Sequence, residues 1–104
     1  MNIQKMMKQA QKMQEQLART QAELAEKTVE ATVGGGKVTV VATGGGDIVS
    51  IKIAKEVVDP EDVEFLEDLV LTGVRTAIEK GRELQQAEMG KVTGGMGLPP
   101  GLGL

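Results

Sequence analysis

The chain has 104 residues, enough for about one domain, and a formal net charge of −3. It contains no Cys, His, Trp or Tyr, and Phe65 is its only aromatic residue. This composition excludes disulfides, Cys-based zinc sites and His-assisted nucleophilic catalysis, and it offers no aromatic platform on which the bases of a single strand could stack.

No apolar run approaches the roughly 18 residues that a membrane-spanning helix needs. The N-terminus also lacks the long apolar segment of a secretory signal. The absence of cysteine fits a reducing compartment. We therefore expect a soluble, cytoplasmic protein with no membrane partner.

The charges are polarised along the chain. Residues 1–27 carry five bases and three acids, whereas residues 59–89 carry three bases and nine acids. Residues 28–58 hold three of each sign. The overall acidity argues against a generic basic nucleic-acid binder, but a basic front and an acidic back half indicate a charged partner.

Residues 3–27 are predicted to form one long helix, because they contain no Gly or Pro and are rich in good helix formers. Apolar residues recur at alternating spacings of three and four, which gives a heptad seam with one polar position. The seam consists of Ile3, Met6, Ala10, Met13, Leu17, Thr20 and Leu24. Such a helix is about 37 Å long, more than a small three-stranded domain can cover. Part of it should project, or pair with a second chain.

Four basic residues follow one stripe of this helix: Lys5, Lys8, Lys12 and Arg19. The first acid of the chain is Glu15, so the three lysines stand near a helix N-terminus, where the macrodipole favours acids. A helix that keeps such unfavourable charge is a candidate for binding an anion such as the DNA backbone. The alternative is an ordinary solvated lysine face.

Residues 28–54 change to β-branched runs that are separated by glycine triplets at 34–36 and 44–46. This pattern predicts a meander of three antiparallel strands. Alternation along the runs makes one sheet face more apolar than the other, and we expect that face to pack against helices.

The segment GGGKVT at 34–39 invites comparison with a phosphate-binding loop, but its spacing is wrong. The glycine expected five positions before Gly36 is Ala31, and the Ser or Thr expected after the lysine is Val38. A strand also follows instead of a helix. Hairpin turns explain these glycines better.

A second long helix is predicted to start with Asp59 as its N-cap and Pro60 at its first position. Gly73 and Gly81 weaken the helix but permit close packing. We expect it to end near Met89. Its apolar stripe consists of Val63, Leu66, Leu69, Val70, Val74, Ala77, Ile78 and Leu84.

The chain thus divides into a folded domain at residues 1–89 and a flexible Gly/Pro-rich tail at residues 90–104. The tail contains six glycines and two prolines. It also holds apolar residues that are unusual for such a segment and favour docking onto some surface: Met96, Leu98, Leu102 and Leu104.

The residues give no basis for an enzyme. Ser50 is the only serine and falls within a predicted strand. The acids between Asp59 and Asp68 are typical of the first turns and outer face of a helix, which explains them better than a metal site does. We expect no catalytic residue, no metal, no cofactor and no small-molecule substrate.

The chain resembles the YbaB/EbfC family of bacterial nucleoid-associated proteins. The likeness is carried by MMKQAQKMQEQL at 6–17, the KVTV and VSIKI strands, DPEDVEFLEDLV at 59–70 and GGMGLPPG at 94–101. The resemblance implies a cytoplasmic homodimer whose sheets form a core and whose helices project, and which binds double-stranded DNA with weak sequence preference. The family's basic helix positions correspond here to Lys5, Lys8, Lys12 and Arg19.

We predict an α+β protein of order α-β-β-β-α, with a three-stranded antiparallel sheet and two long helices, that dimerises through the heptad seam or the strand edges. Its basic residues would contact DNA phosphates, in a role in nucleoid organisation or gene regulation. The alternative is an acidic protein-interaction scaffold that regulates a DNA-processing enzyme without touching DNA, through the face of helix 59–89 and the tail.

Overall fold

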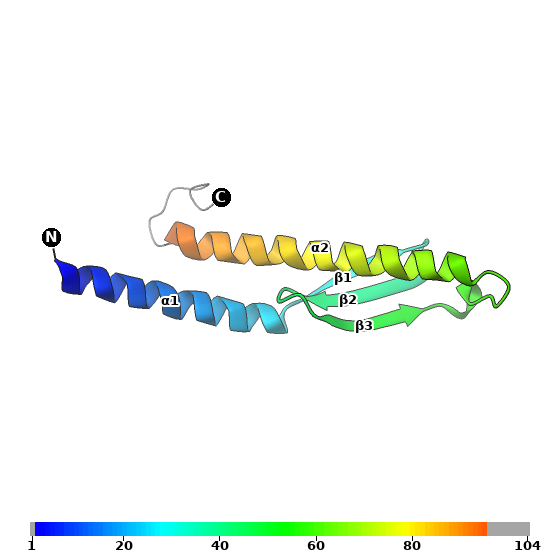
Figure 1. Ribbon diagram of the computed structural model, residues 1–104, viewed down its shortest axis with the longest axis horizontal. Helices are drawn as coiled ribbons and strands as arrows, with labels where there is room; N and C mark the ends of the chain where they lie inside the picture. The colour runs from blue at the N-terminus through cyan, green and yellow to red at the C-terminus, as the bar shows by residue number, and fades with distance from the viewer. Residues whose placement is uncertain (1, 96–104) are drawn as a thin grey trace.

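The computed structural model describes residues 2–95 and has the predicted order α-β-β-β-α (Figure 1). The elements are α1 (Ile3–Glu26), β1 (Thr28–Val33), β2 (Val38–Thr43), β3 (Ile48–Ile53), the short 3-10 helix η1 (Lys55–Val57) and α2 (Val63–Gly95). The three strands form one antiparallel sheet between two long helices, which confirms the α+β class.

The sheet is a meander in the order β1-β2-β3, as the glycine-separated runs predict. Glycines 34–36 close the first hairpin with φ angles of 65°, 66° and 89°, which other residues rarely adopt. Gly46, at φ 99°, belongs to the second hairpin. Val49 is an extra residue in β3 and forms a bulge where the register with β2 shifts.

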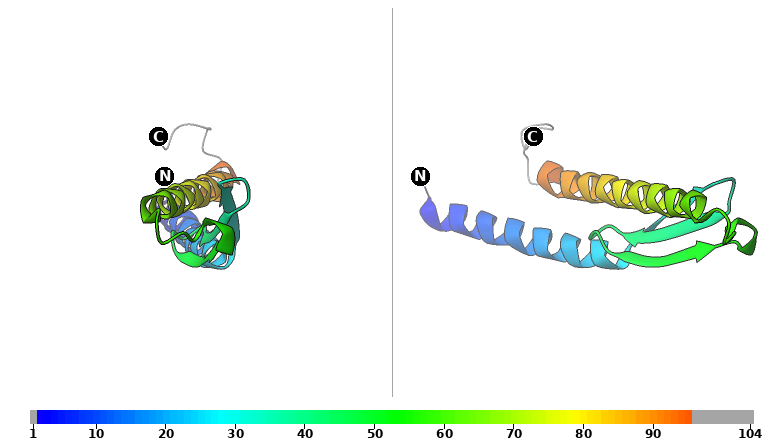
Figure 2. Two further views of the ribbon diagram at one scale, coloured as in Figure 1. Left: turned by 90° about the vertical axis from the view of Figure 1, so that its right-hand side faces the viewer. Right: turned by 45° about the vertical axis from the view of Figure 1, so that its right-hand side comes forward.

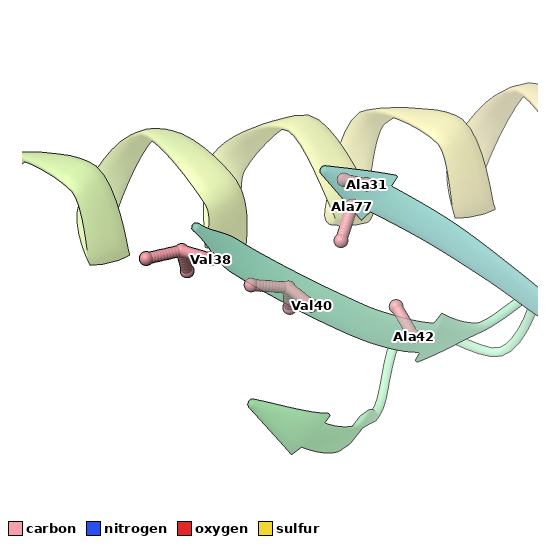
Figure 3. Packing of buried hydrophobic residues seen from close by; sticks show 5 residues of the cluster. All are labelled: Ala31, Val38, Val40, Ala42 and Ala77. Carbon is pink, nitrogen blue, oxygen red and sulfur yellow. The ribbon is translucent and has the colours of Figure 1, made fainter. Parts of the chain in front are cut away.

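One face of the sheet packs against α2 (Figure 3). Its buried residues are Ala31, Val38, Val40, Ala42 and, from α2, Ala77. Two glycines let the helix come close. A Cβ on Gly73 would lie 2.9 Å from Val40 Cγ2, and one on Gly81 would lie 2.6 Å from the carbonyl oxygen of Thr43. The predicted close packing at these glycines is confirmed, and α2 continues through both.

The start of α2 corrects the prediction that Asp59 is its N-cap and Pro60 its first residue. Asp59 instead belongs to a turn around Pro60, in which its Oδ1 accepts the backbone N–H of Glu61 at 2.9 Å. Asp62 caps the helix, since its Oδ1 accepts the N–H of Phe65 at 3.3 Å. An aspartate caps the helix as expected, but the capping residue is Asp62 and not Asp59.

α2 also continues past Met89, where the sequence predicts its end, and reaches Gly95, the last residue that the structure describes. The added turns lie beside α1, and Val92 is half-buried there. This packing offsets the poor helix propensity of Gly90 and its neighbours. The first residues of the predicted tail are therefore helical, and its apolar residues lie outside the described part of the chain: Met96, Leu98, Leu102 and Leu104.

α1 packs against the rest of the chain along its C-terminal half. Thr20 and Leu24 of the heptad seam are buried, and Met13 and Leu17 are half-buried. Ile3, at the other end, is 68% exposed. Figures 1 and 2 show that α1 and α2 run antiparallel and that α1 extends beyond the end of α2. The prediction that part of this helix projects is confirmed.

The molecule is elongated, with principal extents of 71 × 23 × 16 Å. Its Cα radius of gyration is 19.4 Å, whereas a compact domain of this length would have about 13 Å. A single chain of this shape therefore covers little of its own apolar surface.

Part of that uncovered surface lies on β3. Ile51 and Ile53 pair in register with Val40 and Val38, so they point to the same sheet face as the core. α2 packs chiefly over β1 and β2, and the two isoleucines remain 41% and 39% exposed. The expected packing of the apolar face against helices thus holds for β1 and β2 but not for β3.

Candidate nucleic-acid interface

The three predicted lysines lie on the part of α1 that projects past α2. Lys5, Lys8 and Lys12 are all exposed. Within residues 2–95 none of their ammonium groups forms an ion pair or a hydrogen bond. Their charges are therefore available to an anion outside the chain.

The lysines and Arg19 share one side of the helix. At about 100° per residue they fall within a stripe roughly 60° wide, on the side opposite the heptad seam. We call these four residues the basic stripe. Its ends, Lys5 and Arg19, are about 21 Å apart along the helix axis, which matches about six base pairs of a DNA duplex.

The N-terminus of α1 adds to this positive potential. Its N-cap is the neutral Asn2, whose Oδ1 accepts the N–H of Lys5 at 3.2 Å. No acidic residue lies in the first turn. The cap satisfies a backbone donor without adding negative charge, so the dipole and Lys5 act with the same sign.

Arg19 is exposed as well, but it lies beside α2. It borders an open cleft of about 320 Å³ between the two helices. The other lining residues are Gln16, Thr20, Glu88, Lys91 and Val92. The cleft brings a cation of α2, Lys91, next to the end of the basic stripe.

Glu88 is the acid in this cleft. Its Oε1 lies 3.3 Å from Lys27 Nζ and 3.6 Å from Lys91 Nζ. The hydrogen bond from Lys27 lowers the pKa of Glu88 below its ordinary value, and the charges of both lysines act in the same direction. Lys27 and Lys91 both contact this carboxylate, and Arg19 borders the same cleft. The cleft therefore keeps a positive balance.

Lys27 and Lys91 are cations near the basic stripe that sequence reasoning did not single out. The spacing of Lys91 three residues after Glu88 is a weak signal, since such pairs meet on a helix surface. Lys27 has no comparable signal, because it reaches Glu88 only after α1 and α2 pack against each other.

The acidic residues gather at the opposite end of the long axis. α2 begins at the end farthest from the N-terminus of α1 (Figure 1). The exposed acids there are Asp59, Glu61, Asp62, Glu64, Glu67 and Asp68. The charge polarity of the sequence is therefore a polarity of the molecule in space.

Two other kinds of site were sought among residues 2–95. No group of three or more Asp or Glu side chains there is placed to hold a metal ion. No helix of that part of the chain has the length and apolar character that crossing a membrane requires.

The sequence matches known proteins along nearly its whole length. A model of the YbaB/EbfC DNA-binding family matches residues 1–96. A nucleoid-associated protein of Acetivibrio thermocellus is 58% identical over 101 residues, covering 97% of this chain and 89% of the relative. Another, from Thermodesulfovibrio yellowstonii, is 61% identical over 94 residues, covering 90% of this chain and 82% of the relative.

The fold also has a counterpart among solved structures. The crystal structure of the uncharacterized protein HP0035 from Helicobacter pylori matches with a TM-score of 0.73 at 17% identity, over 84% of this chain and 91% of that one. At this identity the likeness shows a shared fold. The family match and the close relatives show more: this chain belongs to the YbaB/EbfC DNA-binding family of nucleoid-associated proteins.

Proposed function

We propose that this protein binds double-stranded DNA in the bacterial nucleoid, within the cytoplasm, as a homodimer that contacts phosphates through α1. Its role is nucleoid organisation or gene regulation. One observation carries the proposal: the basic stripe is exposed on a projecting helix, and its four side chains form no ion pairs within residues 2–95. Family membership supports DNA as the partner, and the stripe is the surface that suits it.

The stripe suits phosphates better than base edges. Three of its four cations are lysines, whose ammonium groups are compact point charges on flexible stems. Only Arg19 has the planar fork that reads guanine through two hydrogen bonds. Binding should therefore have little sequence preference and a steep dependence on salt.

The apolar surface left open by one chain supports the homodimer. Three of the five residues in the central core cluster are alanines, which bury little area. Ile51 and Ile53 lie on the same sheet face as this cluster, and their side chains remain exposed. An apolar groove of about 440 Å³ also runs along α2, lined by Leu66, Glu67, Val70, Leu71 and Val74.

A second copy packed on the face of β3 would complete the core that one chain leaves open. The heptad seam is a weaker choice for this contact, because α2 already covers its C-terminal half. We therefore assign the dimer contact to the core-facing side of β3. Two copies would then present eight stripe cations to one duplex.

Fluorescence anisotropy with a random-sequence duplex tests the proposal. Lys5→Glu/Lys8→Glu/Lys12→Glu should lose binding at low salt and keep its fold by circular dichroism. The matched control, Lys52→Glu/Lys55→Glu/Arg75→Glu, makes the same change in net charge at exposed positions away from the stripe. It should lose far less affinity.

Equal losses in the two variants would mean that only net charge matters and would contradict a site on α1. No binding by the natural chain at low salt would favour the alternative scaffold, which acts on a protein partner.

A further inference from the structure

The projecting arm of α1, residues 3–12, has an uncovered apolar side as well as its basic stripe. Ile3, Met6 and Met7 are 68%, 54% and 59% exposed. Ile3, Met6 and the exposed Ala10 belong to the heptad seam that packs on α2 further along the helix, and Met7 lies beside it. We call these four residues the apolar stripe. It lies on the opposite side of the helix from the basic stripe.

α2 ends beside the point where this stripe begins. Val92 of α2 lines the same cleft as Gln16 of α1, and the two helices run antiparallel (Figure 1). Three more residues carry α2 to Gly95, about 4.5 Å further along its axis and so toward the N-terminal end of α1. The described part of α2 therefore ends near the level of α1 at which the seam loses its cover.

We propose that residues 96–104 of the same chain dock along the apolar stripe and cover the part of the seam that α2 leaves open. Nine residues can span about 30 Å when extended, whereas the seam from Met13 to Ile3 is about 15 Å long. The segment is therefore long enough to lie along the whole stripe.

The chemistry of the segment fits as well. Its sequence, MGLPPGLGL, contains no charged side chain. It supplies four apolar ones, Met96, Leu98, Leu102 and Leu104. Pro99 and Pro100 disfavour a helix, so this sequence suits an extended chain. Because it is attached next to the stripe, its effective concentration there is high, which favours it over a free partner.

Docking of this segment is compatible with DNA binding. The occupant brings no acidic side chain toward the lysines, and it covers the side of the helix that faces away from them. The arm would be held straight by apolar contacts while its cations stay in solvent.

Methyl NMR on the full chain, with labelled Met and Leu side chains, tests the inference. We expect NOEs that join the Met6 or Met7 methyl group to the methyl groups of Leu98 or Leu102. In Leu98→Ser/Leu102→Ser/Leu104→Ser these NOEs should vanish, and amide exchange over residues 6–10 should become on the order of tenfold faster.

Val58→Ser is the control, because it removes an apolar side chain that is 54% exposed on another part of the molecule. It should leave the NOEs and the exchange rates unchanged. Absence of the NOEs in the natural chain overturns the proposal. NOEs that arise only between differently labelled copies in a mixed sample also overturn it, because the segment would then come from a second copy.

Discussion

Lys27 Nζ lies 3.3 Å from Glu88 Oε1, which joins the residue after the end of α1 to the C-terminal half of α2. Lys91 reaches the same oxygen at 3.6 Å. The contact of Lys27 helps to fix the alignment of the two helices, whereas that of Lys91 lies within α2. The Lys27 contact thereby helps to set the direction in which the basic stripe projects.

Acid should weaken this link. The pKa of Glu88 in the folded protein lies below its ordinary value of 4.5. The contribution of the carboxylate to stability is therefore fully present above 4.5 and is lost as the pH falls through the lower folded-state pKa. Glu88→Gln should have a lower Tm than the natural chain at neutral pH, and a Tm that falls less on acidification. Circular dichroism melts across a pH series measure both, and parallel Tm curves for the two proteins would count against the role of Glu88.

The close contact of α2 with the sheet predicts opposite effects for two glycine substitutions. Gly81→Ala should destabilise the protein by about 1–3 kcal/mol, because its Cβ would lie 2.6 Å from the Thr43 carbonyl oxygen. Gly90→Ala has nothing within 4 Å of its Cβ and should stabilise by about 0.5–1 kcal/mol through helix propensity. Urea unfolding measures both, and similar shifts for the two would refute the packing described here.

The position of the α2 cap can be tested with the two aspartates. Asp62→Ala should cost about 1 kcal/mol, because the N–H of Phe65 loses its acceptor. Asp59→Ala removes a turn contact to Glu61 instead and should cost less. Urea unfolding compares them, and a larger loss at Asp59 would restore the helix start that the sequence alone suggests.

Much of the fold follows from local pattern. Glycine triplets between β-branched runs predict the meander, and the heptad seam predicts a helix too long for its domain. The start of α2 is harder, because Asp59 and Asp62 satisfy the same capping rule and only the turn at Pro60 decides between them. The C-terminal end of α2 depends on packing against α1, and local helix propensity carries no information about that packing.

The candidate site also has one part that the sequence predicts and one part that it does not. Lys5, Lys8, Lys12 and Arg19 are visible in the sequence, because a basic stripe at a helix N-terminus contradicts the preference set by the dipole. Lys27 and Lys91 are not, because their roles depend on which residues of two distant helices meet. Whether DNA contacts the four predicted residues stays a prediction.

Two substitutions in β3 distinguish the proposed dimer contact, on the core-facing side of the strand, from a contact on its outer face. Ile51→Glu places a charge on the core-facing side of β3 and should convert the dimer to monomers in sedimentation velocity. Lys52→Glu changes the neighbouring residue, which points to the other face, and should leave the dimer intact. A dimer that survives Ile51→Glu would move the contact elsewhere, with the heptad seam as the next choice.

The most direct test of the central claim is the salt dependence of DNA affinity, measured by anisotropy for the natural chain and for Lys5→Gln/Lys8→Gln/Lys12→Gln. If the dimer engages about six phosphates, its affinity should fall on the order of a thousandfold between about 50 and 200 mM salt. The variant should bind more weakly and with a clearly shallower slope, because fewer counterions are released. A slope that is the same for both proteins, or an affinity that hardly changes with salt, would contradict phosphate binding by the basic stripe.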